Sequence, residues 1–189
     1  YIMCIVYIAD RYGLAVADVS TGDYFVTELD SGRKLLDEIH KFSPSEIICN
    51  ESFYMSGLDL DDLRHRLGMM IYSNDTHFFD DEMCARILKE HFHAASLEGM
   101  GLGDYNCGVI AAGALLKYLY ETQKTSLSHI THITGYATGR YMLLDSSSRR
   151  NLELCETLRE KQKRGSLLWV LDKTKTAMGA RMLRSYIEQ

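Results

Sequence analysis

The residues of this chain that could carry out chemistry are carboxylates near the ends of predicted strands. Asp10 follows one apolar run, Asp18 lies near the end of the next, and Asp75 follows a later one. Carboxylates gathered on a sheet can hold the divalent metals that cleave phosphodiester bonds. The first strand carries no acid before Asp10, so convergence is not expected, and acids commonly solvate strand ends. A metal-dependent nuclease stays the alternative function, with these three residues as its test.

Histidine, cysteine and glycine motifs give no stronger signal. The close pairs His91/His93 and His129/His132 lack both a neighbouring cysteine pair and the HExxH pattern of a metal site. Cysteines at apolar positions behave as small hydrophobes, and these are Cys49, Cys84 and Cys107. The glycines within residues 99–103 follow no predicted strand, and no GxxxxGK[ST] motif occurs. We therefore assign no catalytic, metal-binding or cofactor-binding residue.

The candidates for phosphate contact are basic. Arg149, Arg150 and the basic residues of segment 159–164 form this group. Interleaved aromatic residues are absent, which argues against a platform that stacks single-stranded bases. Arg149 and Arg150 are expected in the first turn of a helix, where the helix dipole opposes their charge. An acidic partner, intramolecular first, is expected for them. Weak, salt-sensitive DNA binding by residues 129–189 stays open.

Composition places the chain among ordinary globular proteins. It has 189 residues, 46% hydrophobic and 25% charged, with a formal net charge of −5. Disordered, collagen-like and coiled-coil classes are excluded, and no apolar run approaches the roughly 20 residues of a membrane helix. Five cysteines without a CxxC pair indicate a reducing compartment. Because the chain starts at Tyr1 and stops at Gln189 inside a helical pattern, we expect a fragment of a longer protein.

Charge is unevenly distributed along the chain. Residues 1–128 hold 20 acidic and 10 basic side chains, a net charge of −10, whereas residues 129–189 hold 6 and 11, a net of +5. Such asymmetry indicates two domains with different surfaces. We therefore predict one domain at 1–128 and the beginning of a second at 129–189.

Residues 1–128 read as an α/β domain. Five strands are predicted, at residues 2–9, 13–19, 24–29, 46–50 and 69–72. Ser31, Asp59 and Asp80 are expected to cap helices. Residues 107–120 form a helix that is apolar nearly all round, and its Gly108 and Gly113 permit close packing. Three meandering strands followed by strand–helix–strand units predict a mixed five-stranded sheet with flanking helices, which is the ribonuclease-H-like fold.

The remaining residues read as an all-α segment. A helix is expected from Ser147 or Ser148 to Lys163, with Leu152, Cys155 and Leu158 on its apolar side. Gly165 would end this helix, and the basic residues before it would sit at the negative end of its dipole. Thr174 or Thr176 would cap a last helix, whose apolar residues recur with a 3.6-residue period.

Several motifs resemble the MutS family of bacterial DNA mismatch-repair proteins. The start of that family's core domain is matched by RRNLEL at 149–154, ETLR at 156–159, GSLLWVLD at 165–172 and TKTAMGARMLR at 174–184. Its connector domain is matched by GLAVADVSTGDYFVTEL at 13–29 and SPSEII at 43–48. The similarity covers essentially the whole chain. One departure is Ser148, where the family pattern has Thr, and both residues can cap a helix.

The resemblance implies a non-catalytic fragment, a connector joined to the first part of the core or lever domain. It implies that the whole protein is a DNA-clamping dimer in the bacterial cytoplasm, associated with the nucleoid, whose ATPase domain uses ATP and Mg²⁺. It also implies that mispaired DNA is recognised by another domain. In the family the connector links the mispair-binding and core domains, transmits conformational change and offers a docking surface for the partner MutL.

The family motifs also supply candidate structural or relay residues, which are Arg149, Arg150, Asn151, Glu153, Trp169, Asp172, Thr174, Thr176, Gly179, Arg181 and Arg184. A further set of large apolar side chains is expected to be covered, either by the connector or by a second copy of the chain. These side chains are Leu167, Leu168, Trp169, Met178 and Met182.

Overall fold

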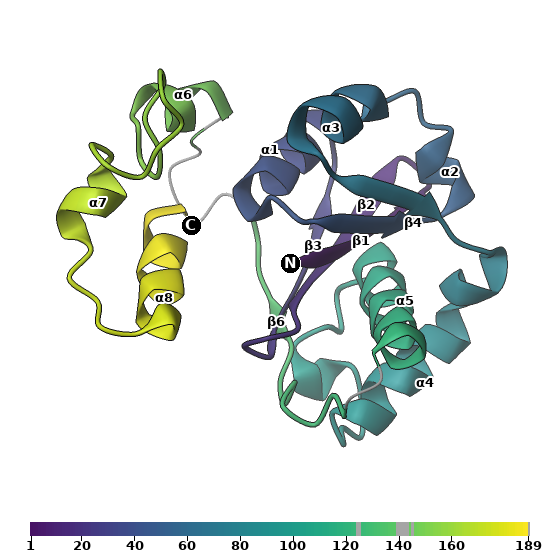
Figure 1. Ribbon diagram of the computed structural model, residues 1–189. Coiled ribbons are helices and arrows are strands. Elements are labelled where there is room, and N and C mark those ends of the chain that lie inside the picture. The colour runs from purple at the N-terminus through teal and green to yellow at the C-terminus, as the bar shows by residue number, and fades with distance from the viewer. Residues whose placement is uncertain (124–125, 139–143, 145, 189) are drawn as a thin grey trace. The chain divides into compact units, whose positions relative to one another are not determined.

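The computed structural model describes residues 1–189 apart from 124–125, 139–143, 145 and 189. The chain divides into two units, Tyr1–Arg140 and Tyr141–Gln189. They are called the N-terminal unit and the C-terminal unit below, and each is described by itself (Figure 1).

The N-terminal unit is built on one mixed sheet. Its strands are β1 (Ile2–Ile8), β2 (Arg11–Asp18), β3 (Asp23–Leu29), β4 (Glu46–Cys49), β5 (Met70–Ser73) and β6 (Thr134–Gly135). The strand order is β5-β4-β1-β2-β3-β6. The neighbours β1–β2 and β2–β3 are antiparallel, whereas β1–β4, β4–β5 and β3–β6 are parallel. The predicted meander and parallel crossovers are therefore confirmed.

The predicted number of strands is wrong, because the sheet has six strands and not five. The sixth, β6, pairs in parallel with β3 through Phe25–Thr134 and Val26–Gly135. A pairing of two residues is too short to produce an alternating pattern in the sequence. The α/β class holds, and the ribonuclease-H-like assignment stays a prediction.

Helices of the N-terminal unit start where the capping residues predict. Its helical elements are α1 (Gly32–Phe42), α2 (Glu51–Tyr54), α3 (Leu60–Leu67), η1 (Thr76–Phe79), α4 (Asp81–His91), η2 (Glu98–Met100) and α5 (Cys107–Thr122). Ser31, Asp59 and Asp80 each accept a hydrogen bond from a backbone N–H of the first turn of α1, α3 and α4. These contacts satisfy donors that the helix itself leaves free.

Helices cover both faces of the sheet (Figure 1). Met3 and Ile5 of β1 face one apolar cluster, to which α1, α2 and α3 contribute. Cys4 and Val6 face the other cluster, to which α4 and α5 contribute. Successive strand residues point to opposite faces, so covering both faces explains why β1 is apolar without alternation.

Two glycines let α5 lie close to its neighbours. A Cβ atom at Gly13 of β2 would come within 2.0 Å of the carbonyl oxygen of Cys107. A Cβ atom at Gly113 of α5 would come within 2.4 Å of the Cα atom of Cys84 in α4. Both distances are far below van der Waals contact. The prediction that Gly113 permits close packing is confirmed, and Gly108 is also tight, with neighbours at 3.1 Å.

The C-terminal unit contains the helices α6 (Ser146–Asn151), α7 (Leu167–Leu171) and α8 (Ala177–Glu188). The predicted helix from Ser147 or Ser148 to Lys163 is wrong, because α6 ends at Asn151. Glu153 adopts a left-handed conformation with φ of 48°, which interrupts a helix. Its carboxylate accepts a hydrogen bond from the N–H of Leu158 at 2.7 Å, so this segment forms turns instead.

The apolar period that predicted this longer helix does not mark a buried face. Leu152 and Leu158 are 56% and 48% exposed. Helices gain most of their stability from the packing of an apolar face, and without burial a short helix is marginal. The predicted cap of the last helix is confirmed for Thr176, whose hydroxyl accepts a hydrogen bond from the N–H of Gly179 at 3.1 Å. Within the described residues, no helix is long and apolar enough to cross a membrane.

The contact between α4 and α5 predicts an effect of Gly113→Ala. The added methyl group collides with the backbone of α4, which cannot move as a flexible side chain can. We expect a loss of about 1–3 kcal/mol in the free energy of unfolding, measured by urea denaturation. Gly99→Ala is the control, because its nearest neighbour is Ser96 Oγ at 3.7 Å. Equal stability of the two variants would contradict this packing argument.

Candidate functional site

Two of the acids that a nuclease would need, Asp10 and Asp18, lie at opposite ends of β1. Ile2 pairs with Ala17 and Ile8 pairs with Arg11 across β1 and β2. Asp18 therefore lies beside the start of β1, whereas Asp10 lies beyond its end. At about 3.3 Å per residue, the length of the strand separates them by roughly 20 Å. Metal ions shared by two carboxylates need them within a few ångström.

Two of these acids, Asp10 and Asp18, have a local structural role. Asp10, in a left-handed turn with φ of 59°, accepts a hydrogen bond from the Tyr7 hydroxyl at 2.8 Å. Asp18 is buried and accepts hydrogen bonds from the N–H and hydroxyl of Ser20 at 2.9 and 2.7 Å. Asp75 follows β5, two strands away from β1. Among the described residues no group of three His, Cys, Asp or Glu could hold a metal. The nuclease alternative is therefore not supported.

The cysteines of the N-terminal unit are buried rather than activated. Burial raises the pKa of the Cys49 and Cys84 thiols to about 12. Burial also raises the pKa of Cys107. A nucleophilic cysteine needs a lowered pKa, since the thiolate is the reactive form. The prediction that these residues act as small hydrophobes is confirmed by their positions in the core.

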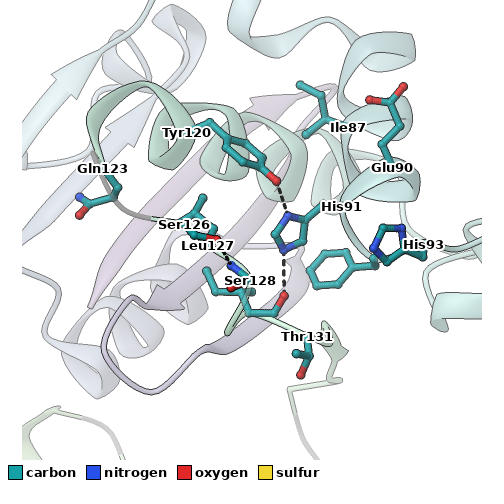
Figure 2. Close-up of a pocket in the computed structure, with 12 residues that line it drawn as sticks. Ile87, Glu90, His91, His93, Tyr120, Gln123, Ser126, Leu127, Ser128 and Thr131 are labelled. Atoms are coloured by element: carbon teal, nitrogen blue, oxygen red, sulfur yellow. Dashed lines mark hydrogen bonds between the residues drawn. The ribbon is translucent and has the colours of Figure 1, made fainter.

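A hollow of the N-terminal unit lies where the end of α4 meets the segment after α5, as Figure 2 shows. It has a volume of about 880 Å³. His91 projects into it between Tyr120 and the 126–131 segment. One ring nitrogen, Nδ1, lies 2.5 Å from the Tyr120 hydroxyl, and Nε2 lies 2.8 Å from the carbonyl oxygen of Ile130.

This geometry makes His91 a structural joint, meaning a residue that connects three segments of the chain, rather than a catalytic residue. A carbonyl oxygen only accepts, so Nε2 carries the proton and Nδ1 can accept from Tyr120. Both nitrogens are then engaged, and a general base needs one within reach of a substrate proton. His91 ties α4 to α5 and to the chain that follows α5. The pair His91/His93 lacks the pattern of a metal site, and its first member has a structural role.

In the C-terminal unit, the carboxylate of Asp172 contacts the motif residue Thr174 and also Lys163. Its carboxylate accepts hydrogen bonds from the backbone N–H and the hydroxyl of Thr174, at 3.0 and 2.6 Å. It also pairs with the ammonium group of Lys163. The hydrogen bond from Lys163, followed by those from Thr174, holds the pKa of Asp172 well below its ordinary value. This cluster fixes the bend between α7 and α8.

The earlier electrostatic interpretation of the basic residues is wrong in two respects. Lys163 belongs to the turn before α7 and pairs with Asp172, so it does not compensate the dipole of a longer helix. Arg149 and Arg150 lie in the last turn of α6 and not in a first turn. The helix dipole favours positive charge at that end. Arg149 Nε donates to the carbonyl oxygen of Leu144 at 3.0 Å, where an acidic partner was expected.

A second cluster of the C-terminal unit surrounds Cys155. Arg184 Nε lies 2.9 Å from the Glu188 carboxylate. Burial and the nearby Glu188 raise the pKa of the Cys155 thiol to about 12. Arg184 is thus one motif residue with a defined partner. The motif residues Arg150, Asn151 and Arg181 are exposed.

The large apolar residues of the C-terminal unit are mostly uncovered within that unit. Leu168 is buried, whereas Leu167 and Trp169 are 43% and 49% exposed. Met178 and Met182 of α8 are 53% and 57% exposed. Their burial against the N-terminal unit or against a second copy stays a prediction.

Sequence reasoning missed Ser166, which is almost fully buried and begins α7. Its hydroxyl oxygen accepts from the N–H of Trp169 at 3.2 Å and donates to the carbonyl of Lys163 at 2.7 Å. The signal was available, because a serine between Gly165 and an apolar run is typical of a helix start. Lys163 was missed as an ion-pair partner, and no local pattern could have identified it. Glu188 was also missed, although its i,i+4 spacing from Arg184 on a predicted helix favours an ion pair.

An α/β module is thus followed by a helical one, and the described residues of both use their polar side chains for caps, turns and ion pairs. Such a chain fits the class of structural modules within a larger protein. Comparison with known families agrees, since "MutS domain II" matches residues 1–131 and "MutS domain III" matches residues 147–189. The chain belongs to the MutS family.

Three similar proteins are each named DNA mismatch repair protein MutS. The one from Lachnoclostridium phytofermentans is 61% identical over 189 residues, which is 100% of this chain and 20% of that protein. Those from Ruminiclostridium cellulolyticum and Acetivibrio thermocellus are 46% and 43% identical over 192 residues, each covering 100% of this chain and 22% of the relative. The chain spans about a fifth of the length of these relatives.

The joint at His91 predicts a loss of stability in His91→Ala. The carbonyl of Ile130, a buried residue, loses its donor, and an unsatisfied buried group costs about 1–3 kcal/mol. Urea denaturation measures this difference. His132→Ala is the matched control, because His132 is exposed, and it should stay within about 0.5 kcal/mol of the unchanged chain. A neutral His91→Ala would show that the joint contributes nothing.

The lowered pKa of Asp172 predicts how its cluster responds to acid. A group whose pKa is lower in the folded state stabilises that state above its unfolded pKa, which is about 3.9. The contribution is therefore constant from pH 7 to about 5, falls as pH drops below the unfolded value, and is lost as pH passes through the folded value. We expect the carboxyl ¹³C shift of Asp172, followed by NMR, to titrate at lower pH than in a Lys163→Ala variant, which lacks the paired ammonium group. If Asp172 titrated at the same pH as in that variant, the contacts proposed for its cluster would be contradicted.

Proposed function

We propose that this chain is a non-catalytic connector joined to the first part of the core or lever domain of a mismatch-recognition protein. In this proposal residues 1–128 form the connector and residues 129–189 begin the core. The observation that carries it is the order of the two family matches, domain II followed by domain III. The opposite net charges of the two segments, −10 and +5, are in keeping with two modules of different surroundings.

The connector in this proposal links the mispair-binding and core domains, transmits conformational change and offers a docking surface for MutL. Its polar residues serve structure, as the acids at the strand ends and the joint at His91 illustrate. ATP and Mg²⁺, mismatched DNA and the second protomer of a dimer are assigned to the whole protein, acting through its other domains. The whole protein is placed in the bacterial cytoplasm, near the nucleoid.

The candidate relay residues are assigned to the core part of the chain. Arg149, Glu153, Asp172, Thr174 and Arg184 each make a defined polar contact there. Thr176 and Gly179 form the cap of α8. We propose that these contacts hold the turns between the short helices, so that movement of one helix is passed to the next. Trp169, Arg150, Asn151 and Arg181 would supply contacts to other parts of the whole protein.

Docking is tested by capture of the cognate MutL on the immobilised 189-residue chain. We expect saturable binding at micromolar concentrations, as for other transient complexes. An unrelated immobilised protein with the same net charge of −5 is the control for capture by charge alone, and a salt series separates the two because screening weakens purely electrostatic contacts. Absence of saturable binding at high micromolar MutL would remove docking from the proposal.

A further inference from the structure

The segment that leaves the N-terminal unit is fixed to the sheet at Tyr136. The N–H of Tyr136 donates to the carbonyl of Val26 at 3.0 Å. Its own carbonyl accepts from the hydroxyl of Thr27 at 2.6 Å and from that of Tyr105 at 3.3 Å. The two residues of β6 that precede it are both exposed. The backbone pairing of this segment is therefore short and open to water.

The side chain of Tyr136 makes a stronger connection than the strand does. Its hydroxyl donates to the Glu38 carboxylate of α1 at 2.6 Å, and Glu38 is only 7% exposed. The ammonium group of Lys41 lies 3.5 Å from that carboxylate and 5.0 Å from the Tyr136 ring. The ring also contacts Phe25 and Phe42, each with centroids 6.4 Å away. Hydrogen bonds to charged acceptors are about twice as strong as neutral ones.

The segment is therefore held mainly by the contacts of the Tyr136 side chain, and not by the backbone pairing of β6. A pairing of two exposed residues closes and opens readily on its own, since local opening follows the number of buried contacts. The buried partners belong to Tyr136 and α1, which lie 98 positions apart in the sequence. The hydrogen bond from Tyr136 to Glu38 therefore adds a charged, buried contact to the ring contacts and backbone hydrogen bonds that dock β6. The next residue toward the N-terminus that is anchored in the core is Ile133, which is 9% exposed.

We propose that Tyr136 and Glu38 form a latch that sets where the chain leaves the N-terminal unit. With the latch closed, the chain departs after Tyr136. With it open, β6 leaves the edge of β3 and the chain departs after Ile133. The three residues released, 134–136, add at most about 10 Å of reach to the chain beyond them. The purpose of the latch rests on the proposed relay function. The length of chain between two modules limits how far one module can move relative to the other.

Amide hydrogen exchange of the 189-residue chain tests the latch. Tyr136→Phe keeps the ring and removes only the hydroxyl group. We expect exchange at residues 134–136 to accelerate about tenfold or more, which matches the loss of one hydrogen bond to a charged group. Glu38→Gln retains an acceptor oxygen without the charge and should give a smaller acceleration at the same amides. Amides of α5 should keep their protection in both variants.

Tyr120→Phe is the matched control, because it removes a tyrosine hydroxyl from the joint at His91 and leaves β6 untouched. It should leave exchange at residues 134–136 unchanged. The latch is overturned if Tyr136→Phe leaves β6 exchange unchanged, or if it accelerates α5 as much as β6, which would mark an ordinary packing residue. Loss of MutL capture tests docking alone, so failure of the latch and failure of the proposed function are separate results.

Discussion

The close approach of α5 to the sheet is the constraint on which the N-terminal unit depends. Eleven residues of this helix are buried, and Gly13 and Gly113 remove the side chains that would otherwise hold β2 and α4 away. With α1 on the opposite face, the central strand β1 is covered on both sides. Burying a charge there would be costly without a partner. The candidate acids thus lie at or beyond strand ends, and the length of β1 keeps Asp10 and Asp18 apart.

The C-terminal unit is held together by a different kind of interaction. None of the described residues of α8 is buried, and in α7 only Leu168 is. Its order comes from caps and ion pairs, such as the Asp172 cluster and the cap at Thr176. Each such contact is individually modest near the surface. This unit therefore lacks the close-packed interior that makes the N-terminal unit resist deformation.

The parts of the fold that local rules decide were predictable from the sequence. Ser31, Asp59 and Asp80 cap helices because a short polar side chain can reach the free N–H groups of the next turn. The strand β6 was missed because its position depends on Tyr136 contacting Glu38, a non-local contact that leaves no periodic signal. The helix expected up to Lys163 failed because its apolar spacing is not matched by burial, and periodicity alone does not report burial.

The distinction between local and non-local contacts applies to the candidate site as well. The family motifs indicated Asp172 and Thr174 from the sequence, and their mutual hydrogen bonds are local. The partner Lys163, nine positions away, had a plausible but wrong explanation as a helix-end charge. A charged side chain in an irregular segment has many possible partners within reach. The conformation of the backbone determines which of them it contacts. Residue types could therefore be predicted for the site, and their pairing could not.

The contrast between the two units bears on how a relay would work. A module with a close-packed core moves as a rigid body, since repacking its interior costs several kcal/mol. Polar contacts near the surface can exchange one partner for another, or for water, at much smaller cost. In the proposed relay, movement that reaches this chain would therefore be carried unchanged by the sheet and α5. It would be absorbed or redirected at turns such as the one at Asp172, which is held by an ion pair with Lys163 and two hydrogen bonds from Thr174.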